Sequence, residues 1–267
     1  ANPLGAEFSV MRPSMLPAMM KTLERNMRNG QAMLKMFDIG KTFHHASWAK
    51  TFIPGIEERE HLCIAISGNA TAEQWSAKQR TVDFYDIKGI IEDLCTELQL
   101  TSIKFRAPKT ESKVFTANSL EIVAKNGTLG IFGEVSLPYR SGFGIDTPVY
   151  AAEINLSALY AVKPAARAYK QVGHFPAVKR DVAFVVDAGV TSEQIGKVIT
   201  QTGGELLVNS SIFDVFEGKS LGEGKKSLAF TMTFQSAERT LVEQEIQQAV
   251  SAIISAVEKA TGGKLRE

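Results

Sequence analysis

Apolar side chains near the start of the chain recur at intervals of three and four residues, which is the spacing of one helix face. The positions that form this face are Leu16, Met19, Met20, Leu23 and Met27. Ser14 can cap the helix, and Pro17 falls in its first turn, where a missing N–H does no harm. The pattern therefore predicts an amphipathic helix.

After this helix, the spacing of the apolar residues predicts several strands and one further helix. The further predicted elements are a strand with Phe37, Ile39 and Phe43 on one face, a half-buried strand over 62–66, a helix over 84–98, a hairpin over 120–135 that turns at Asn126-Gly127, and a strand over 149–156. Helices beside a mostly antiparallel sheet indicate an α+β fold.

The last third of the chain predicts a βαββαβ sandwich of the ferredoxin-like type. Its first strand carries Val182, Phe184 and Val186 on one face. A later strand alternates fully between a core face (Leu228, Phe230, Met232, Phe234) and an open face (Ser227, Ala229, Thr231, Thr233, Gln235). Because the open face is small and polar, we expect solvent or a partner on that side of the sheet.

Two capping boxes are predicted in this sandwich. Thr191 and Gln194 would begin the first helix, which ends at Gly203-Gly204. Thr240 and Glu243 would begin the second, with Val242 on its buried face and an end near Gly262-Gly263. We place one domain at residues 1–160, a linker without apolar period at 161–172, and a second domain at 173–267.

Composition narrows the functional classes. The 30 basic and 29 acidic residues give a formal charge of +1, which does not suit a protein that grips nucleic acid by bulk charge. No apolar run is long enough to span a membrane. The start of the chain has neither Met nor a signal-peptide pattern, so we expect a cytoplasmic fragment of a longer protein. Cys63 and Cys95 are expected to be buried thiols in a reducing compartment.

Catalytic signatures are weak. His44 and His45 are adjacent and would point to opposite faces of a strand, while His61 and His174 lie apart, so we expect no metal site. The chain has no nucleophile elbow, and the spacing of Gly130 and Gly133 fits no phosphate loop.

The candidate RNA-binding residues are cations near the predicted strand ends and loops of the second domain: Lys179, Arg180, Lys225, Lys226 and Arg239. Phe213 and Phe216 are expected to pack in the core rather than stack on bases. Any RNA contact is therefore predicted to be a modest patch.

Several segments, in this order, resemble the C-terminal part of the bacterial phenylalanyl-tRNA synthetase beta subunit family. They are Asn-Pro-Leu at 2–4, Met-Arg-Pro-Ser-Met-Leu-Pro at 11–17, Met-Phe-Asp-Ile-Gly-Lys-Thr-Phe at 36–43, Asp-Phe-Tyr-Asp-Ile-Lys-Gly at 83–89 and Gly-Ile-Phe-Gly-Glu-Val at 130–135. The motifs of the last third resemble the family's ferredoxin-fold anticodon-binding domain. One departure is Phe115-Thr116-Ala117, where the family commonly has His-Pro-Gly.

The resemblance implies a class II synthetase-like sheet without catalytic activity, followed by a domain that binds the anticodon region of phenylalanine tRNA. It also implies an alpha subunit that uses ATP and magnesium, and a second beta chain in an alpha2-beta2 heterotetramer. Gly40-Lys41-Thr42 stands where a class II enzyme has its Arg-x-Glu pair, which agrees with a scaffold role. No cofactor is expected in this fragment.

Two other functions stay open, because a fold alone does not determine function. The second domain could be a ferredoxin-like regulatory module that binds an amino acid, or a purely structural assembly domain. Calorimetry with phenylalanine tests the first alternative, and tRNA footprinting with and without residues 173–267 tests the second.

Overall fold

The computed structural model describes residues 10–51, 53–166, 169 and 173–266. The chain divides into two compact units, Ala1–Arg167 and Ala168–Glu267. The Asn-Pro-Leu segment at 2–4 and most of the second half of the predicted linker lie outside the described residues. Of the linker's first half, Val162 is buried in the core of the first unit, and the Ala165 N–H donates to the Gln99 carbonyl (2.8 Å).

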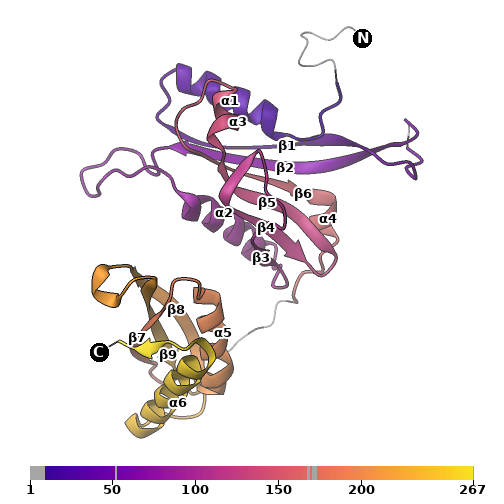
Figure 1. Ribbon diagram of the computed structural model, residues 1–267. Coiled ribbons are helices and arrows are strands. Elements are labelled where there is room, and N and C mark those ends of the chain that lie inside the picture. The colour runs from indigo at the N-terminus through magenta and orange to yellow at the C-terminus, as the bar shows by residue number, and fades with distance from the viewer. Residues whose placement is uncertain (1–9, 52, 167–168, 170–172, 267) are drawn as a thin grey trace. The chain divides into compact units, whose positions relative to one another are not determined.

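The first unit is built on a six-stranded antiparallel sheet, as the α+β prediction requires (Figure 1). In spatial order its strands are β1 (Met33–His45), β2 (Ile56–Gly68), β6 (Val149–Asn155), β5 (Gly127–Val135), β4 (Phe115–Ala124) and β3 (Lys104–Arg106). Its helices are α1 (Leu16–Arg28), α2 (Phe84–Glu97), α3 (Leu137–Ser141) and α4 (Leu156–Tyr160).

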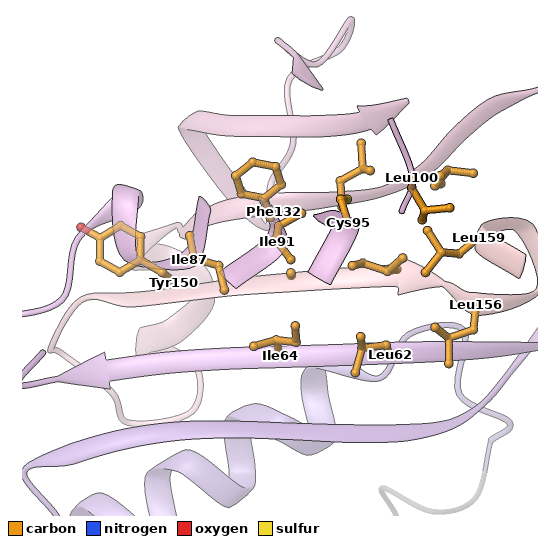
Figure 2. Close-up of a cluster of buried hydrophobic side chains, with 14 of the residues drawn as sticks. Leu62, Ile64, Ile87, Ile91, Cys95, Leu100, Phe132, Tyr150, Leu156 and Leu159 are labelled. Carbon is orange, nitrogen blue, oxygen red and sulfur yellow. The ribbon is translucent and has the colours of Figure 1, made fainter. Parts of the chain in front are cut away.

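Both faces of this sheet carry a hydrophobic core. Leu62, Ile64 and Ile66 of β2 pack in the cluster that contains α2, and Figure 2 shows Ile87, Ile91 and Cys95 of the helix in that cluster. Cys63 and Ala65 of the same strand pack in the cluster that contains α1. The prediction of a half-buried strand was therefore wrong for β2. Alternation alone does not reveal that both faces are covered when the second face carries small apolar residues.

A partly buried carboxylate fixes the start of α1. Glu153 on β6 accepts hydrogen bonds from the Ser14 hydroxyl (2.6 Å) and the Met15 N–H (2.8 Å). Ser14 Oγ in turn accepts from the Leu16 N–H (3.1 Å), so Ser14 acts as a cap although Met15 occupies the N-cap position. The predicted place of Pro17 in the first turn is confirmed. This clamp ties the helix to the centre of the sheet.

The second unit is a four-stranded antiparallel sheet, which confirms the ferredoxin-like prediction. Its strands, in spatial order, are β10 (Lys264–Leu265), β7 (Val178–Asp187), β9 (Lys225–Phe234) and β8 (Leu207–Phe216). Its helices are α5 (Ser192–Gly203), α6 (Glu243–Thr261) and the 3-10 turns η2 (Gly204–Leu206) and η3 (Lys219–Leu221). The predicted core face of β9, from Leu228 to Phe234, is buried with side chains of both α-helices.

One of the two predicted capping boxes is confirmed. The Gln194 N–H donates to Thr191 Oγ1 (3.2 Å), and the Thr191 N–H donates to Gln194 Oε1 (2.8 Å). At its C-terminus, α6 ends as expected, because Gly262 adopts a left-handed φ of 68°.

The second capping box was placed wrongly. Helix α6 begins only at Glu243, because Val242 is extended (φ −91°, ψ 150°) and 56% exposed. The Val242 N–H donates to Glu245 (3.1 Å), and Arg239 binds the same carboxylate. Valine has no side-chain acceptor, so only half of a box exists here.

The clamp on α1 gives a stability prediction. Glu153→Ala leaves the buried Met15 N–H without its acceptor, so we expect the free energy of unfolding of the first unit to fall by about 2–3 kcal/mol. Urea denaturation measures this fall. Glu121→Ala is the matched control, because it removes only a partly exposed ion pair with Arg106 (2.8 Å) and should cost less than about 1 kcal/mol. Equal losses of stability in the two variants would contradict the clamp.

Candidate nucleic-acid interface

The five predicted RNA-binding cations do not form one patch. Lys179 lies opposite Thr233, whereas Lys225 lies opposite Asp187, at the other end of the same strand pair. At about 3.4 Å per residue, these ends are roughly 27 Å apart. Lys179 and Arg180 therefore lie at one end of the sheet, and Lys225 and Lys226 lie at the other.

Carboxylates bind three of these cations. Arg180 pairs with both oxygens of Glu243 (2.7 and 2.6 Å), and Arg239 pairs with both oxygens of Glu245. The hydrogen bond from Arg239 is the largest cause that lowers the pKa of Glu245 to about 2. Lys225 Nζ lies 3.5 Å from Asp187. For Lys179 and Lys226 the described residues show no ion pair. Sequence spacing could not reveal these pairs, because Arg180 and Glu243 are 63 residues apart.

The sheet face away from the helices is polar and small along β9, as predicted. The register places Ser227, Ala229, Thr231 and Thr233 there, and the Thr231 hydroxyl donates to Asp181 (2.6 Å). Ala229 and Ser227 are buried despite being on this face. The face is therefore covered towards the Ser227 end.

A cation–aromatic pair covers that end. Phe216 of β8 lies opposite Ser227, and the Arg266 guanidinium lies 5.2 Å from the centre of the Phe216 ring. Arg266 Nη1 also donates to Ser227 Oγ (3.3 Å), and its backbone N–H donates to the Ala183 carbonyl (2.8 Å). Arg266, which directly follows β10, thus contacts residues of β7, β8 and β9.

The expectation that Phe213 and Phe216 pack in the core was wrong. Phe213 is 58% exposed and Phe216 is 38% exposed. Strand β8 is the edge of the sheet, and a register shift between Ile212 and Asp214 changes the alternation. Asp214 and Phe216 lie opposite Ala229 and Ser227, which are on the polar side of β9. This pairing is the signal that could have placed Phe216 on the open face.

This cluster has the chemistry that binds a nucleobase. An exposed aromatic ring and a guanidinium plane stack on bases. Asp214 lies opposite Ala229 on the same face, two residues before Phe216, and its carboxylate can only accept hydrogen bonds. Ser227 is buried, and its hydroxyl accepts from Arg266, so it helps to position the guanidinium. The open face therefore offers stacking together with the Asp214 carboxylate, which can accept from a base edge.

The first unit has a polar hollow of about 410 Å³ over its sheet. Its charged groups are already engaged: Glu153 by the start of α1, Glu121 by Arg106 (2.8 Å), and Arg59 by Glu57 (2.6 Å). ATP with magnesium requires carboxylates that are available to the metal and cations that are available to the phosphates. The residues described in this hollow do not fit ATP with magnesium.

Two histidines meet beside this hollow. Thr42 Oγ1 lies 2.6 Å from His61 Nδ1 and 2.9 Å from His44 Nε2. Burial lowers the pKa of His61, which favours the neutral ring. Among the described residues, no three His, Cys, Asp or Glu side chains gather to hold a metal ion, and no helix is long and apolar enough to cross a membrane.

Both units match families of aminoacyl-tRNA synthetase domains. Residues 1–156 match the phenylalanyl-tRNA synthetase beta chain CLM domain, and residues 173–266 match the ferredoxin-fold anticodon binding domain. The chain belongs to the phenylalanyl-tRNA synthetase beta chain family, which confirms the resemblance found in its motifs.

Curated relatives agree with this assignment. The chain is similar to proteins named phenylalanine–tRNA ligase beta subunit from Shouchella clausii (32% identity over 266 residues), Salinibacter ruber (30% over 273) and Vibrio cholerae (35% over 271). Each alignment covers 100% of this chain but only 32% or 33% of the relative. The chain thus spans about a third of the length of the relatives it matches.

Proposed function

We propose that this chain is a non-catalytic part of the beta subunit of phenylalanine–tRNA ligase. In this proposal, the first unit supports the alpha subunit, which carries out aminoacylation with ATP and magnesium. The second unit binds the anticodon region of phenylalanine tRNA. The assembly would be a cytoplasmic alpha2-beta2 heterotetramer. Residues 1–160 and 173–267 would be the two domains, with 161–172 as their linker.

The observation that carries the RNA part of this proposal is the cluster on the open sheet face. A base stacks on Phe216 and the Arg266 guanidinium. Asp214 accepts from a base edge that donates, such as that of guanine. The stacking of bases on a small number of aromatic and guanidinium planes explains how a domain in a chain of charge +1 can bind RNA.

Phosphate contacts come from the cations around this face. Lys225 and Lys226 begin β9, directly before Ser227, and are thus close to the base site. Lys179 lies on the open face at the opposite end, beside Arg180. Arg180 and Arg239 contribute only if RNA phosphate displaces Glu243 and Glu245. We propose Lys225 and Lys226 as the principal phosphate contacts, because Lys225 Nζ lies 3.5 Å from Asp187, farther than the separation in the two arginine pairs, and Lys226 has no ion pair among the described residues.

Phe216→Ala tests the base site. Removal of one stacking platform is worth about 1–3 kcal/mol, so we expect the Kd for phenylalanine tRNA to rise roughly 5- to 150-fold. Filter binding or fluorescence anisotropy at fixed salt measures this change. The slope of log Kd against log salt should stay as in the wild type, because the lysines that bind phosphate are unaltered.

Phe213→Ala is the matched control for this experiment. It removes the same kind of side chain from the same strand, at the register shift between Ile212 and Asp214, where Phe213 has no partner on β9. We expect it to leave the affinity within about twofold of the wild type. Equal effects of the two variants would contradict a base site at Phe216.

The double variant Lys225→Ala/Lys226→Ala tests the phosphate contacts. It should weaken tRNA binding and reduce the salt slope by about 0.7–0.9 for each phosphate that is no longer neutralised. Lys197→Ala is a suitable control, because Lys197 lies on α5 and pairs with Glu193. An unchanged affinity and salt slope in the double variant would sink this assignment.

A further inference from the structure

An apolar groove of about 490 Å³ lies on the first unit, between the edge strand β1 and helix α2. Phe37 and Ile39 of β1 line one side of it, and Ile90 and Leu94 of α2 line the other. Strand β2, which pairs with β1, lies between them and forms the floor. The groove is therefore built from three elements rather than from one exposed side chain.

The side chains of the groove continue the core of the first unit. Phe37 lies opposite Ile64 in the β1–β2 register, and Ile39 lies opposite Leu62. Leu62 and Ile64 are buried, and Figure 2 shows them on β2 in the cluster that contains α2. Phe37 is 73% exposed and Ile39 is 51% exposed. In the described part of the chain, the cover of this core thus ends at α2.

The lining of the groove argues for a protein segment as its occupant. Among the described residues that line it, Lys35 is the one that carries a charge. Surfaces that bind RNA are rich in cations, which this groove is not. A second copy in a twofold dimer would bring its own groove, and two hollows leave each other unfilled. A lining that is almost free of charge is typical of a permanent protein interface.

The described chain starts beside the same edge strand. The Phe43 N–H donates to the Arg12 carbonyl (2.9 Å), and Arg12 Nε donates to the Lys41 carbonyl (2.8 Å). Lys41 follows Ile39 by two residues, which is about 7 Å along β1. Polypeptide that precedes Val10 therefore joins the first unit next to the β1 side of the groove.

The length of the relatives supplies such polypeptide. This chain covers only 32% or 33% of each relative, so about two thirds of a protein of that length lie outside it. Because the motifs resemble the C-terminal part of the family, these two thirds would precede the chain. A segment joined to the chain beside β1 has a high effective concentration at the groove, which a separate subunit lacks.

We propose that the part of the beta subunit that precedes this chain packs in the groove between β1 and α2 and buries Phe37 and Ile39. The inference rests on the proposed function, because that proposal makes the chain the last third of a longer beta subunit. It adds an interface within the beta subunit. The occupant presents apolar side chains, since the groove offers no charge among its described residues apart from Lys35.

The reactivity of a thiol in place of Phe37 tests this contact in the longer beta subunit, prepared without the alpha subunit. Cys63 and Cys95 are buried, so a maleimide reads the introduced thiol once cysteines of the preceding part are replaced by serine. Phe37→Cys should react about 10-fold or more slowly in the longer subunit than in this chain, because a covered thiol reacts only through local opening. Tyr85→Cys is the matched control, since Tyr85 is 75% exposed on α2 and does not line the groove; its rate should change less than about threefold.

Hydrogen exchange of the unaltered proteins gives a second measurement that needs no substitution. The amides of residues 35–39 should exchange about 10-fold or more slowly in the longer beta subunit than in this chain. Strand β8 is also a sheet edge and serves as the control, because its amides should exchange at the same rate in both proteins.

The other results overturn the inference. If Phe37→Cys stays reactive until the alpha subunit is added, the groove belongs to that subunit, and if tRNA protects it, the groove belongs to RNA. Protection in this chain alone, with elution as a dimer, assigns the groove to a second copy, and reactivity in every mixture shows that nothing covers it. Size-exclusion chromatography with the alpha subunit tests the proposed function separately: without a complex the proposed partnership fails, while the labelling rates in the beta subunit still decide on the groove.

Discussion

The structure depends on one geometric constraint, namely that neighbouring residues of a strand face opposite sides of a sheet. On β9 this constraint sends Leu228, Phe230, Met232 and Phe234 into the core and Ser227 to the open face. The pairing with β8 then brings Phe216 beside Ser227. A slip of one residue would bury polar groups and expose the core, so the large apolar residues that stabilise the fold also fix the site.

Local patterns of the sequence predicted most elements, because their signals are contained within a few residues. The Thr191–Gln194 box and the ferredoxin-like order are examples. The short elements β3, α3 and α4 were missed, since three to five residues carry too little periodicity. The box at Thr240 failed because two glutamates lie close together here, and it is Glu245 rather than Glu243 that accepts from the N–H of the N-cap residue, Val242.

The candidate site was harder to predict than the fold, because it depends on contacts between distant residues. The cations were recognised by type, but their carboxylate partners come from other elements, such as Glu243 for Arg180. Phe216 was assigned to the core because aromatic residues in strands usually pack there. Its place on an edge strand, and its contact with Arg266, become visible only when the strand order is known.

Strand β10 is very short, and its shortness affects how the proposed base site forms. It comprises only Lys264 and Leu265, yet it holds Arg266 against Phe216. Because only a few backbone hydrogen bonds hold β10, this end of the sheet can fray in the free protein. The amides of β10 should therefore exchange with solvent long before those of β7 or β9. In the proposed base site, part of the binding energy would then go into ordering β10, so that binding of a base and folding of β10 would be one event.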